Sequence, residues 1–181
     1  MDDYLATPNI LDRLQRERDS LIARVHSISA DIHDKRPDPT CWSIAEVLEH
    51  LMRVELGVTK LLTVRGQSAP AADTPSPDES SLLTPAVSAL VRDRSRGIEA
   101  PERVRPSGAV SSQDAIAQLA NTRAGLISAF SSADREALDR VTHPHPVFGL
   151  LTLRSWVAFS ADHEARHSDQ IAEIAQRLGA I

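Results

Sequence analysis

Two histidines stand four residues apart near the C-terminus, in the stretch SADHEARHSDQI. In a helix, positions i and i+4 lie on the same face one turn apart, so His163 and His167 would point the same way. Two imidazoles in that arrangement can chelate one divalent metal ion. They can equally form hydrogen bonds with each other, with water or with a nearby carboxylate. The spacing alone leaves both interpretations open.

The apolar residues around this pair indicate that both histidines face the protein interior. At about 100° per residue, their positions fall inside a stripe of apolar side chains. The stripe is formed by Trp156, Phe159, Ile171, Ile174 and Leu178. An unpaired polar group in a core costs about 1–3 kcal/mol, so two buried imidazoles require partners.

His50 is the candidate for a third metal ligand. It lies at the edge of an apolar stripe on another expected helix, between Val47 and Val54. A metal ion held by three histidines keeps open positions for water or substrate, as a catalytic site requires. The alternative is a boundary histidine that reaches solvent, and considered singly His50 fits that description well.

Arg123 falls near the middle of an apolar face, seven residues from both Ile116 and Phe130. A permanent charge at such a position needs a partner. One candidate is an anionic group of a substrate, which Arg123 would clamp. The other, which we favour, is a structural role, in which the side chain either reaches the surface or forms an ion pair with, for example, Glu46 or Glu49.

The remaining candidates carry weaker signals. His143 and His145 lie in the proline-rich THPHPVFG and can line the mouth of a site, although we expect exposed loop residues. His26 and His33 are expected at the surface or its boundary. Cys41 lacks a base or an electropositive setting in its sequence surroundings, so we expect a packing residue.

Four amphipathic segments are expected to position these residues. The first begins at Thr7, and Pro8 suits its first turn. The second begins with Ser43 and Glu46, a capping-box pattern that leaves Glu46 as a cap or as a group orienting a metal ligand. The four long helices are expected at 7–33, 43–66, 111–131 and 152–178, with short helices at 84–96 and 134–140 and a loop from Val141 to Thr152. No strand-like alternation persists, so the pattern predicts an all-α four-helix bundle.

The stretch GQSAPAADTPSPDESS opens a long connection between the second and third long helices. Its proline, serine and aspartate content and its lack of periodicity are typical of a mobile segment. We expect residues 66–111 to form a partly irregular and partly mobile insertion, or a crossover between two helices.

Size and composition restrict the class of protein. The length of 181 residues predicts a single domain that spans residues 1–181, and a content of 41% hydrophobic residues suffices for a core. A net charge of −5 and an aromatic content of 3% argue against a nucleic-acid partner. The single cysteine, the absence of a signal-peptide pattern and the lack of a long apolar run predict a cytoplasmic protein without a membrane partner.

Two blocks of the chain resemble the DinB/YfiT superfamily. One is WSIAEVLEHL, which contains His50, and the other is HPVFGLLTLRSWVAFSADHEARHSDQI, which contains His163 and His167. The resemblance implies a four-helix bundle, often dimeric, in which these three histidines hold a divalent metal ion such as zinc or nickel. Some members of the family are thiol-dependent transferases or isomerases that use bacillithiol, mycothiol or glutathione. The long connection at 66–111 departs from the family pattern.

The residues and the resemblance together predict a metal-dependent enzyme that acts on a small molecule. The metal ion would activate water for hydrolysis, or bind a low-molecular-weight thiol as the nucleophile of a transfer reaction. One alternative is a metal-binding or stress-response bundle without turnover. Another is a structural bundle whose histidines are satisfied by hydrogen bonds.

Overall fold

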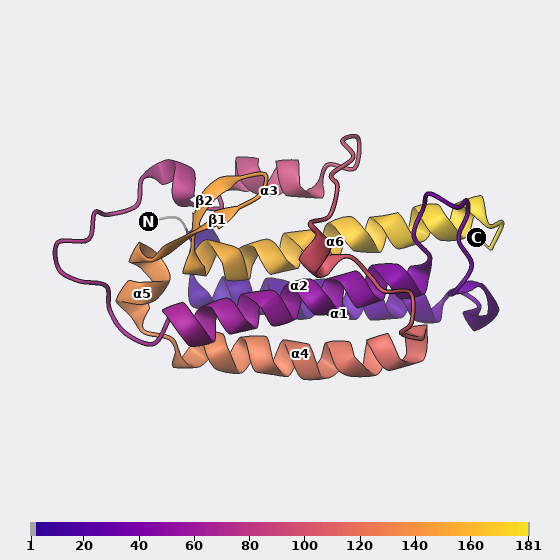
Figure 1. Cartoon of the computed structure of the whole chain (residues 1–181), viewed down its shortest axis with the longest axis horizontal. Coiled ribbons are helices and arrows are strands. Elements are labelled where there is room, and N and C mark those ends of the chain that lie inside the picture. Colours follow the sequence, from indigo (N-terminus) through magenta and orange to yellow (C-terminus); the bar gives the residue numbers. More distant parts are fainter. Residues whose placement is uncertain (1–2, 181) are drawn as a thin grey trace.

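The computed structural model describes residues 3–180 and consists mainly of helices (Figure 1). The long helices of the bundle are α1 (Thr7–His26), α2 (Ile44–Arg65), α4 (Ser112–Ser132) and α6 (Leu153–Arg177). Short helices α3 (Pro85–Arg92) and α5 (Arg135–Arg140) and the strands β1 (Thr142–His145) and β2 (Gly149–Thr152) complete the regular structure, with single 3-10 turns between them. The predicted all-α four-helix bundle is confirmed.

The helices α2 and α4 run in the same direction, opposite to α1 and α6 (Figure 1). The backbone N–H of Asp134 donates to the carbonyl of Gly66 at 2.8 Å, which joins the C-terminal ends of α2 and α4. The chain must therefore travel the full length of the bundle between these helices. Residues 66–111 form this crossover, which is one of the two arrangements that the sequence predicted for the segment.

Two apolar clusters fill the bundle, one at each end. The first includes Leu14, Val58 and Leu126, and the second includes Leu21, Met52 and Leu119. A layer of buried charges lies between them, formed by Arg18, Glu55, Arg123 and Glu164. Each long helix contributes one residue to this layer, so all four helices are tied together at the same height.

The first helix ends earlier than predicted. Helix α1 stops at His26, and after the extended residue Ser29 a 3-10 turn covers Ala30–Ile32. Ile28 and Ile32 are nevertheless buried. The apolar spacing continues across the break because the turn returns Ile32 to the same core, and this continuity made the helix look longer.

The predicted loop before α6 is in fact an antiparallel hairpin. Strand β1 pairs with β2 in a register that sets Thr142 opposite Thr152 and His145 opposite Gly149. Gly149 adopts a φ of +72°, which favours glycine. The strands are short and β1 contains Pro144, so period-two alternation could not reveal them.

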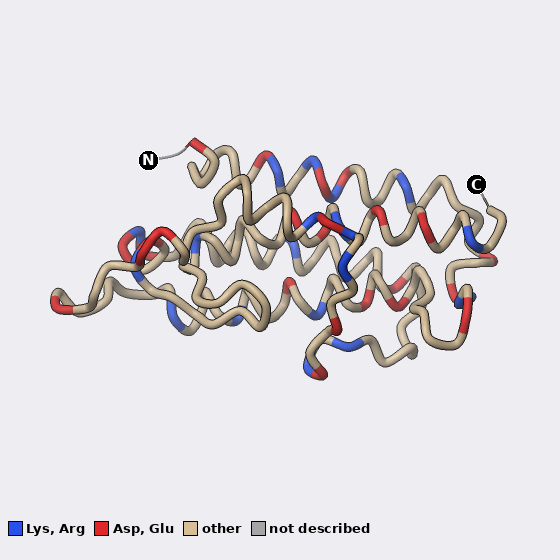
Figure 2. Tube along the Cα trace, turned by 90° about the horizontal axis from the view of Figure 1, so that it is seen from above, with Lys and Arg blue, Asp and Glu red and all other residues tan. Residues whose placement is uncertain are grey.

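The crossover is anchored on α6 by several ion pairs and hydrogen bonds. Arg92 at the end of α3 binds Asp162 at 2.8 Å, and the Arg166 guanidinium donates to the carbonyl of Arg96 at 2.8 Å. Figure 2 shows residues of both charge signs along this segment and the helices beneath it. The short helix predicted at 84–96 ends at Arg92, where Asp93 becomes extended.

Within residues 3–180, no helix combines the length and the apolar character that a membrane span requires.

Candidate metal centre

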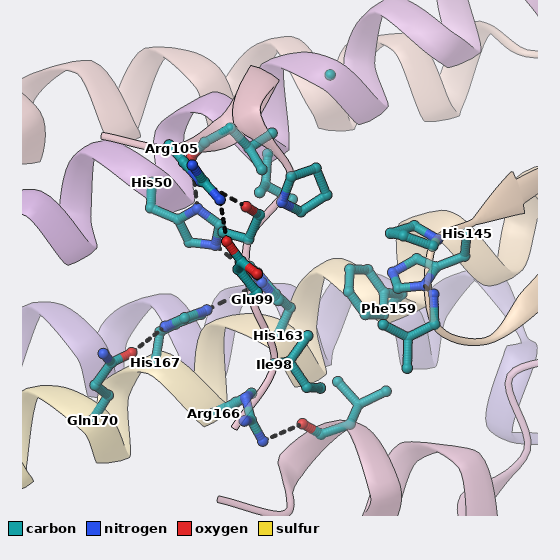
Figure 3. Close-up of a pocket in the computed structure, with 18 of the residues that line it drawn as sticks. His50, Ile98, Glu99, Arg105, His145, Phe159, His163, Arg166, His167 and Gln170 are labelled. Atoms are coloured by element: carbon teal, nitrogen blue, oxygen red, sulfur yellow. Dashed lines mark hydrogen bonds and ion pairs between the residues drawn. The ribbon is translucent and has the colours of Figure 1, made fainter. Parts of the chain in front are cut away.

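The three predicted histidines meet inside the bundle (Figure 3). Helix α2 supplies His50, and α6 supplies His163 and His167 one turn apart. The Nε2 atom of His163 lies 3.3 Å from Nε2 of His50 and 3.1 Å from Nε2 of His167. The ligand atoms of all three residues lie within 4.8 Å of one another, close enough to bind one metal ion.

Hydrogen bonds on the outer side of two rings orient their nitrogens. His50 Nδ1 donates to the carbonyl of Val104 at 2.8 Å, and His167 Nδ1 donates to Oε1 of Gln170 at 2.7 Å. A proton on Nδ1 leaves a lone pair on Nε2, which is the atom that faces the centre. Outer hydrogen bonds of this kind are typical of metal-ligating histidines.

The spacing of the nitrogens fits a transition-metal ion. With a metal–nitrogen bond of ~2.0–2.1 Å, two nitrogens of a tetrahedral site lie roughly 3.3 Å apart. The Nε2–Nε2 separations of His163 from His50 and from His167 are 3.3 and 3.1 Å. Three imidazoles without carboxylates or thiolates suit zinc, nickel, copper or iron rather than magnesium or calcium.

The surroundings keep these rings neutral. Burial lowers the pKa of His50, and it lowers the pKa values of His163 and His167 well below 6.5. The charges that His167 and His50 would carry when protonated further lower the pKa of His163, and the charge of His50 further lowers that of His167. A neutral imidazole is the form that binds a metal ion, so the trio is prepared for a ligand role at pH 7.

The trio forms part of the wall of a cavity of about 920 Å³. His50 and His167 are buried, whereas His163 is partly accessible. The aromatic and aliphatic part of the wall includes Val54, Val58, Leu61, Phe148, Trp156 and Phe159. The described residues also contribute seven lysines and arginines to the lining, against two glutamates. The cavity therefore combines an apolar surface with a positive potential.

The crossover closes over the trio through contacts that the sequence did not reveal. The fully buried carboxylate of Glu49, next to His50, accepts from the backbone N–H and the hydroxyl of Ser107 at 2.8–2.9 Å and from Gly108 N–H at 3.1 Å. Gly108 adopts a φ of +72° and a Cβ there would come within 3.3 Å of Glu46 Oε1. Glu49 and His50 thus hold consecutive parts of the crossover, one through Ser107 and the other through Val104.

Arg123 does not line the cavity, so the proposed clamp for an anionic substrate has no support in the structure. Its guanidinium pairs with Glu55 and Glu164, both at 2.5 Å, in the charged layer of the bundle. The favoured structural role is therefore correct in the form of an ion pair and not of a side chain that reaches the surface, but the suggested partners are wrong. Glu46 closes the capping box with Ser43 and pairs with Arg36, and Glu49 pairs with Arg53.

The other histidines and the cysteine differ in outcome. His145 and His143 line the cavity and are partly buried, so the interpretation as exposed loop residues is wrong. His26 is exposed as expected. His33 is buried, where Nδ1 contacts the Ser112 hydroxyl at 3.0 Å, contrary to prediction. The partly buried thiol of Cys41 donates to Asp38 at 3.1 Å.

The sequence and the fold are similar to those of known proteins. A model of the DinB superfamily matches residues 13–171. The uncharacterized protein YuaE of Bacillus subtilis (strain 168) is 32% identical over 146 residues, which cover 80% of this chain and 84% of YuaE.

Two solved structures share the bundle. One is YfiT from Bacillus subtilis, described as a probable metal-dependent hydrolase with an unusual four-helix bundle topology; it has a TM-score of 0.62 and 15% identity, covering 96% of this chain and 88% of that one. The other, TT2238, is described as a four-helix bundle protein and has a TM-score of 0.58 and 20% identity, covering 92% and 98%. At these identities the structures show a common fold. Because the family model spans most of the sequence, the chain belongs to the DinB superfamily.

Proposed function

We propose that the protein is a metal-dependent hydrolase of small molecules, with one divalent ion held by His50, His163 and His167. The observation that carries the proposal is the convergence of three neutral imidazoles whose Nε2 atoms face one centre. The fold of YfiT, a probable metal-dependent hydrolase, supports it. Zinc and nickel are the ions we expect, because the ligand set consists of nitrogen atoms alone.

The residues of the site provide what hydrolysis requires. A divalent ion held by neutral ligands supplies Lewis acidity, and three ligands leave positions for water and substrate. Val104 and Gln170 keep the Nε2 lone pairs of His50 and His167 directed inward. The cavity of about 920 Å³ is at the upper end of the ~300–1,000 Å³ that small-molecule sites occupy.

The proposal is tested by turnover of the zinc- and nickel-loaded protein on a panel of carboxylic esters and amides. We expect multiple turnovers that disappear on chelation and in His167→Ala. His143→Ala is the matched control, because His143 lines the same cavity outside the trio and should keep both metal and turnover. Thermal unfolding of each variant shows that it is folded.

Three results would contradict the hydrolase proposal. Turnover that persists without metal would remove the metal from the mechanism. Turnover only when glutathione or another thiol accompanies an electrophile would identify a thiol-dependent transferase instead. A bound ion with no turnover on either panel would favour the non-catalytic metal-binding bundle.

A further inference from the structure

His145 lies in the same cavity as the trio, at its aromatic end (Figure 3). Its Nδ1 atom accepts from the backbone N–H groups of Val147 at 3.2 Å and Phe148 at 3.3 Å. A nitrogen that accepts carries no proton, so in the neutral ring the proton must be on Nε2. The hairpin turn thus gives His145 one defined tautomer, with an N–H donor on the opposite side of the ring.

Three aromatic rings hold this imidazole in place. The ring centroids of Phe159, Trp156 and Phe148 lie 4.6, 4.8 and 5.0 Å from that of His145. Burial among them, together with the positive charge of Arg103, lowers the pKa of His145 to about 4. At pH 7 the ring is therefore a neutral and rigid hydrogen-bond donor.

The Nε2–H group of His145 is directed at open space. Among residues 3–180 it has no hydrogen-bond partner, and the only side-chain nitrogen or oxygen that is both enclosed and unpartnered is Arg13 Nη1. His145 Nε2 is therefore accessible, and His145 is one of the residues that line the cavity. An unpartnered donor in the wall of this cavity is available to an acceptor atom of a ligand.

Arg103 adds a positive charge to this end of the cavity. It precedes Val104, whose carbonyl holds His50, and its charge reaches both His143 and His145. Three other arginines of the cavity form ion pairs, Arg94 with Glu173, Arg105 with Glu99 and Arg177 with Asp38. A fourth, Arg166, donates hydrogen bonds to backbone carbonyls. Within the described chain Arg103 has no carboxylate within 4.0 Å, so its charge is available to a ligand.

We propose that this end of the cavity is a subsite for a carboxylate group of the substrate, bound by His145 Nε2–H and the Arg103 guanidinium. The apolar part of the substrate would lie against Phe148, Trp156 and Phe159. The inference rests on the proposed function, because it adds the substrate class to the same site. It identifies that class as small carboxylic acids with an aryl or alkyl body and a hydrolysable bond at some distance from the carboxylate.

The positions of the rings set the separation between the subsite and the trio. The Phe159 centroid lies 5.1 Å from that of His163 and 4.6 Å from that of His145. The two histidine rings are therefore separated by no more than the sum of these distances. A chain of a few carbon atoms can connect a carboxylate at His145 with a reacting bond at the trio.

The test measures binding of 3-phenylpropionate and of its uncharged amide by titration calorimetry, with zinc-loaded and with metal-free protein. We expect the carboxylate to bind at least about tenfold more tightly than the amide, since a charge-assisted contact discriminates by that order. The preference should persist without metal, because the subsite does not include the trio. Metal content measured on the same samples reports separately on the proposed function.

Two variants and one control locate the binding. Arg103→Gln removes the charge, and His145→Asn removes the Nε2–H donor while its amide oxygen can still accept from Val147 and Phe148. Each should weaken 3-phenylpropionate binding about tenfold and leave the amide unchanged. Arg96→Gln is the control, because Arg96 lines the same cavity but has its charge beside Asp93.

Three outcomes would overturn the subsite. Equal affinity for the acid and the amide would show that no anion site exists. An equal loss in Arg96→Gln would show a diffuse electrostatic effect, not a defined contact. Binding of the carboxylate only to the zinc-loaded protein would place it on the metal ion.

Discussion

The tautomers of two of the three histidines, His50 and His167, depend on residues that do not contact the centre. Gln170 accepts the Nδ1–H of His167 at 2.7 Å, and the carbonyl of Val104 does the same for His50 at 2.8 Å. Each outer acceptor also increases the basicity of the inner nitrogen. We therefore expect the affinity for a metal ion to depend on residues outside the proposed ligand set.

Replacing Gln170 by leucine tests this dependence. The Nδ1–H of His167 then loses its acceptor, and we expect the dissociation constant for zinc to rise ~10- to 100-fold. Competition with a chromophoric chelator measures it. Gln176→Leu on the exposed face of α6 is the matched control, and an equal loss of affinity in that variant would contradict the assignment.

The stability of the fold should depend on pH through the protonation of His145. Its folded-state pKa, about 4, lies below the ordinary value of 6.5, so the native state binds this proton less readily than the unfolded chain. Its contribution to stability is therefore complete above about pH 6.5 and is lost as the pH falls towards 4.

Urea unfolding of the metal-free protein measures this contribution. The free energy of unfolding should fall less steeply between pH 6.5 and 4 in His145→Phe than in the wild type, because phenylalanine takes up no proton. Identical slopes would show that His145 titrates alike in the folded and unfolded chains.

The histidines of the candidate metal centre could be predicted from the sequence, but the residues that orient them could not. The angular positions of His163 and His167 within the apolar stripe already required buried partners, and the helical block with His50 supplied the third ring. The acceptor Val104 and the anchor Ser107 lie more than fifty residues from His50 in an aperiodic segment, where the hydrogen-bonding distances depend on the crossover path. Periodicity contains no information on that path.

At the scale of elements, the crossover determines how the site is closed. Glu49 accepts three hydrogen bonds from Ser107 and one from Gly108, and it also pairs with Arg53. This one buried carboxylate joins the start of α2 to the segment that carries Val104 and Arg103. A substitution at Glu49 should therefore affect both the structure of the crossover and the position of His50.

Glu49→Gln should increase amide hydrogen exchange over residues 103–110 and lower the free energy of unfolding by roughly 1–3 kcal/mol. The buried charge that accepts these N–H groups is removed, while the size of the side chain is kept. Exchange measured by mass spectrometry and urea unfolding test the two parts. Glu99→Gln is the control, because the Glu99 side chain is 84% exposed in its pair with Arg105. Unchanged exchange in Glu49→Gln would contradict the anchoring role.

The ends of a helix could be predicted where capping residues mark them in the sequence. The capping box of Ser43 and Glu46 set the start of α2, and the pattern near residue 111 set the start of α4. The end of α1 was misplaced because Ile28 and Ile32 extend the apolar stripe beyond the helix. The hairpin was missed because four-residue strands are stabilised by packing of Leu151 against the bundle, not by local preference.

At the scale of the whole molecule, the charged layer joins all four long helices. Arg18 and Arg123 each pair with both Glu55 and Glu164, and the layer separates the two apolar clusters. Sequence periodicity correctly placed Arg123 on a buried face. Its partners lie on other helices, so their identity depends on how far the helices are shifted against one another along the bundle axis. The sequence of a single helix does not specify that shift.

Arg123→Met tests the structural role of this layer. Removing one member of a buried ion pair typically costs about 3–5 kcal/mol, because the remaining carboxylates lose their compensating charge. Urea unfolding should show a loss of that order, while the folded fraction keeps its metal content. A stable variant that binds 3-phenylpropionate poorly would instead restore the substrate clamp that the structure argues against.

The proposed metal centre holds one divalent ion through three imidazole nitrogens, those of His50, His163 and His167. X-ray absorption at the zinc edge of the loaded protein measures the number, the type and the distances of the ligands. We predict three imidazole nitrogens at ~2.0–2.1 Å in the wild type, and two in His167→Ala. A shell made of oxygen or sulfur atoms, or a spectrum that does not change in His167→Ala, would contradict coordination by these three histidines.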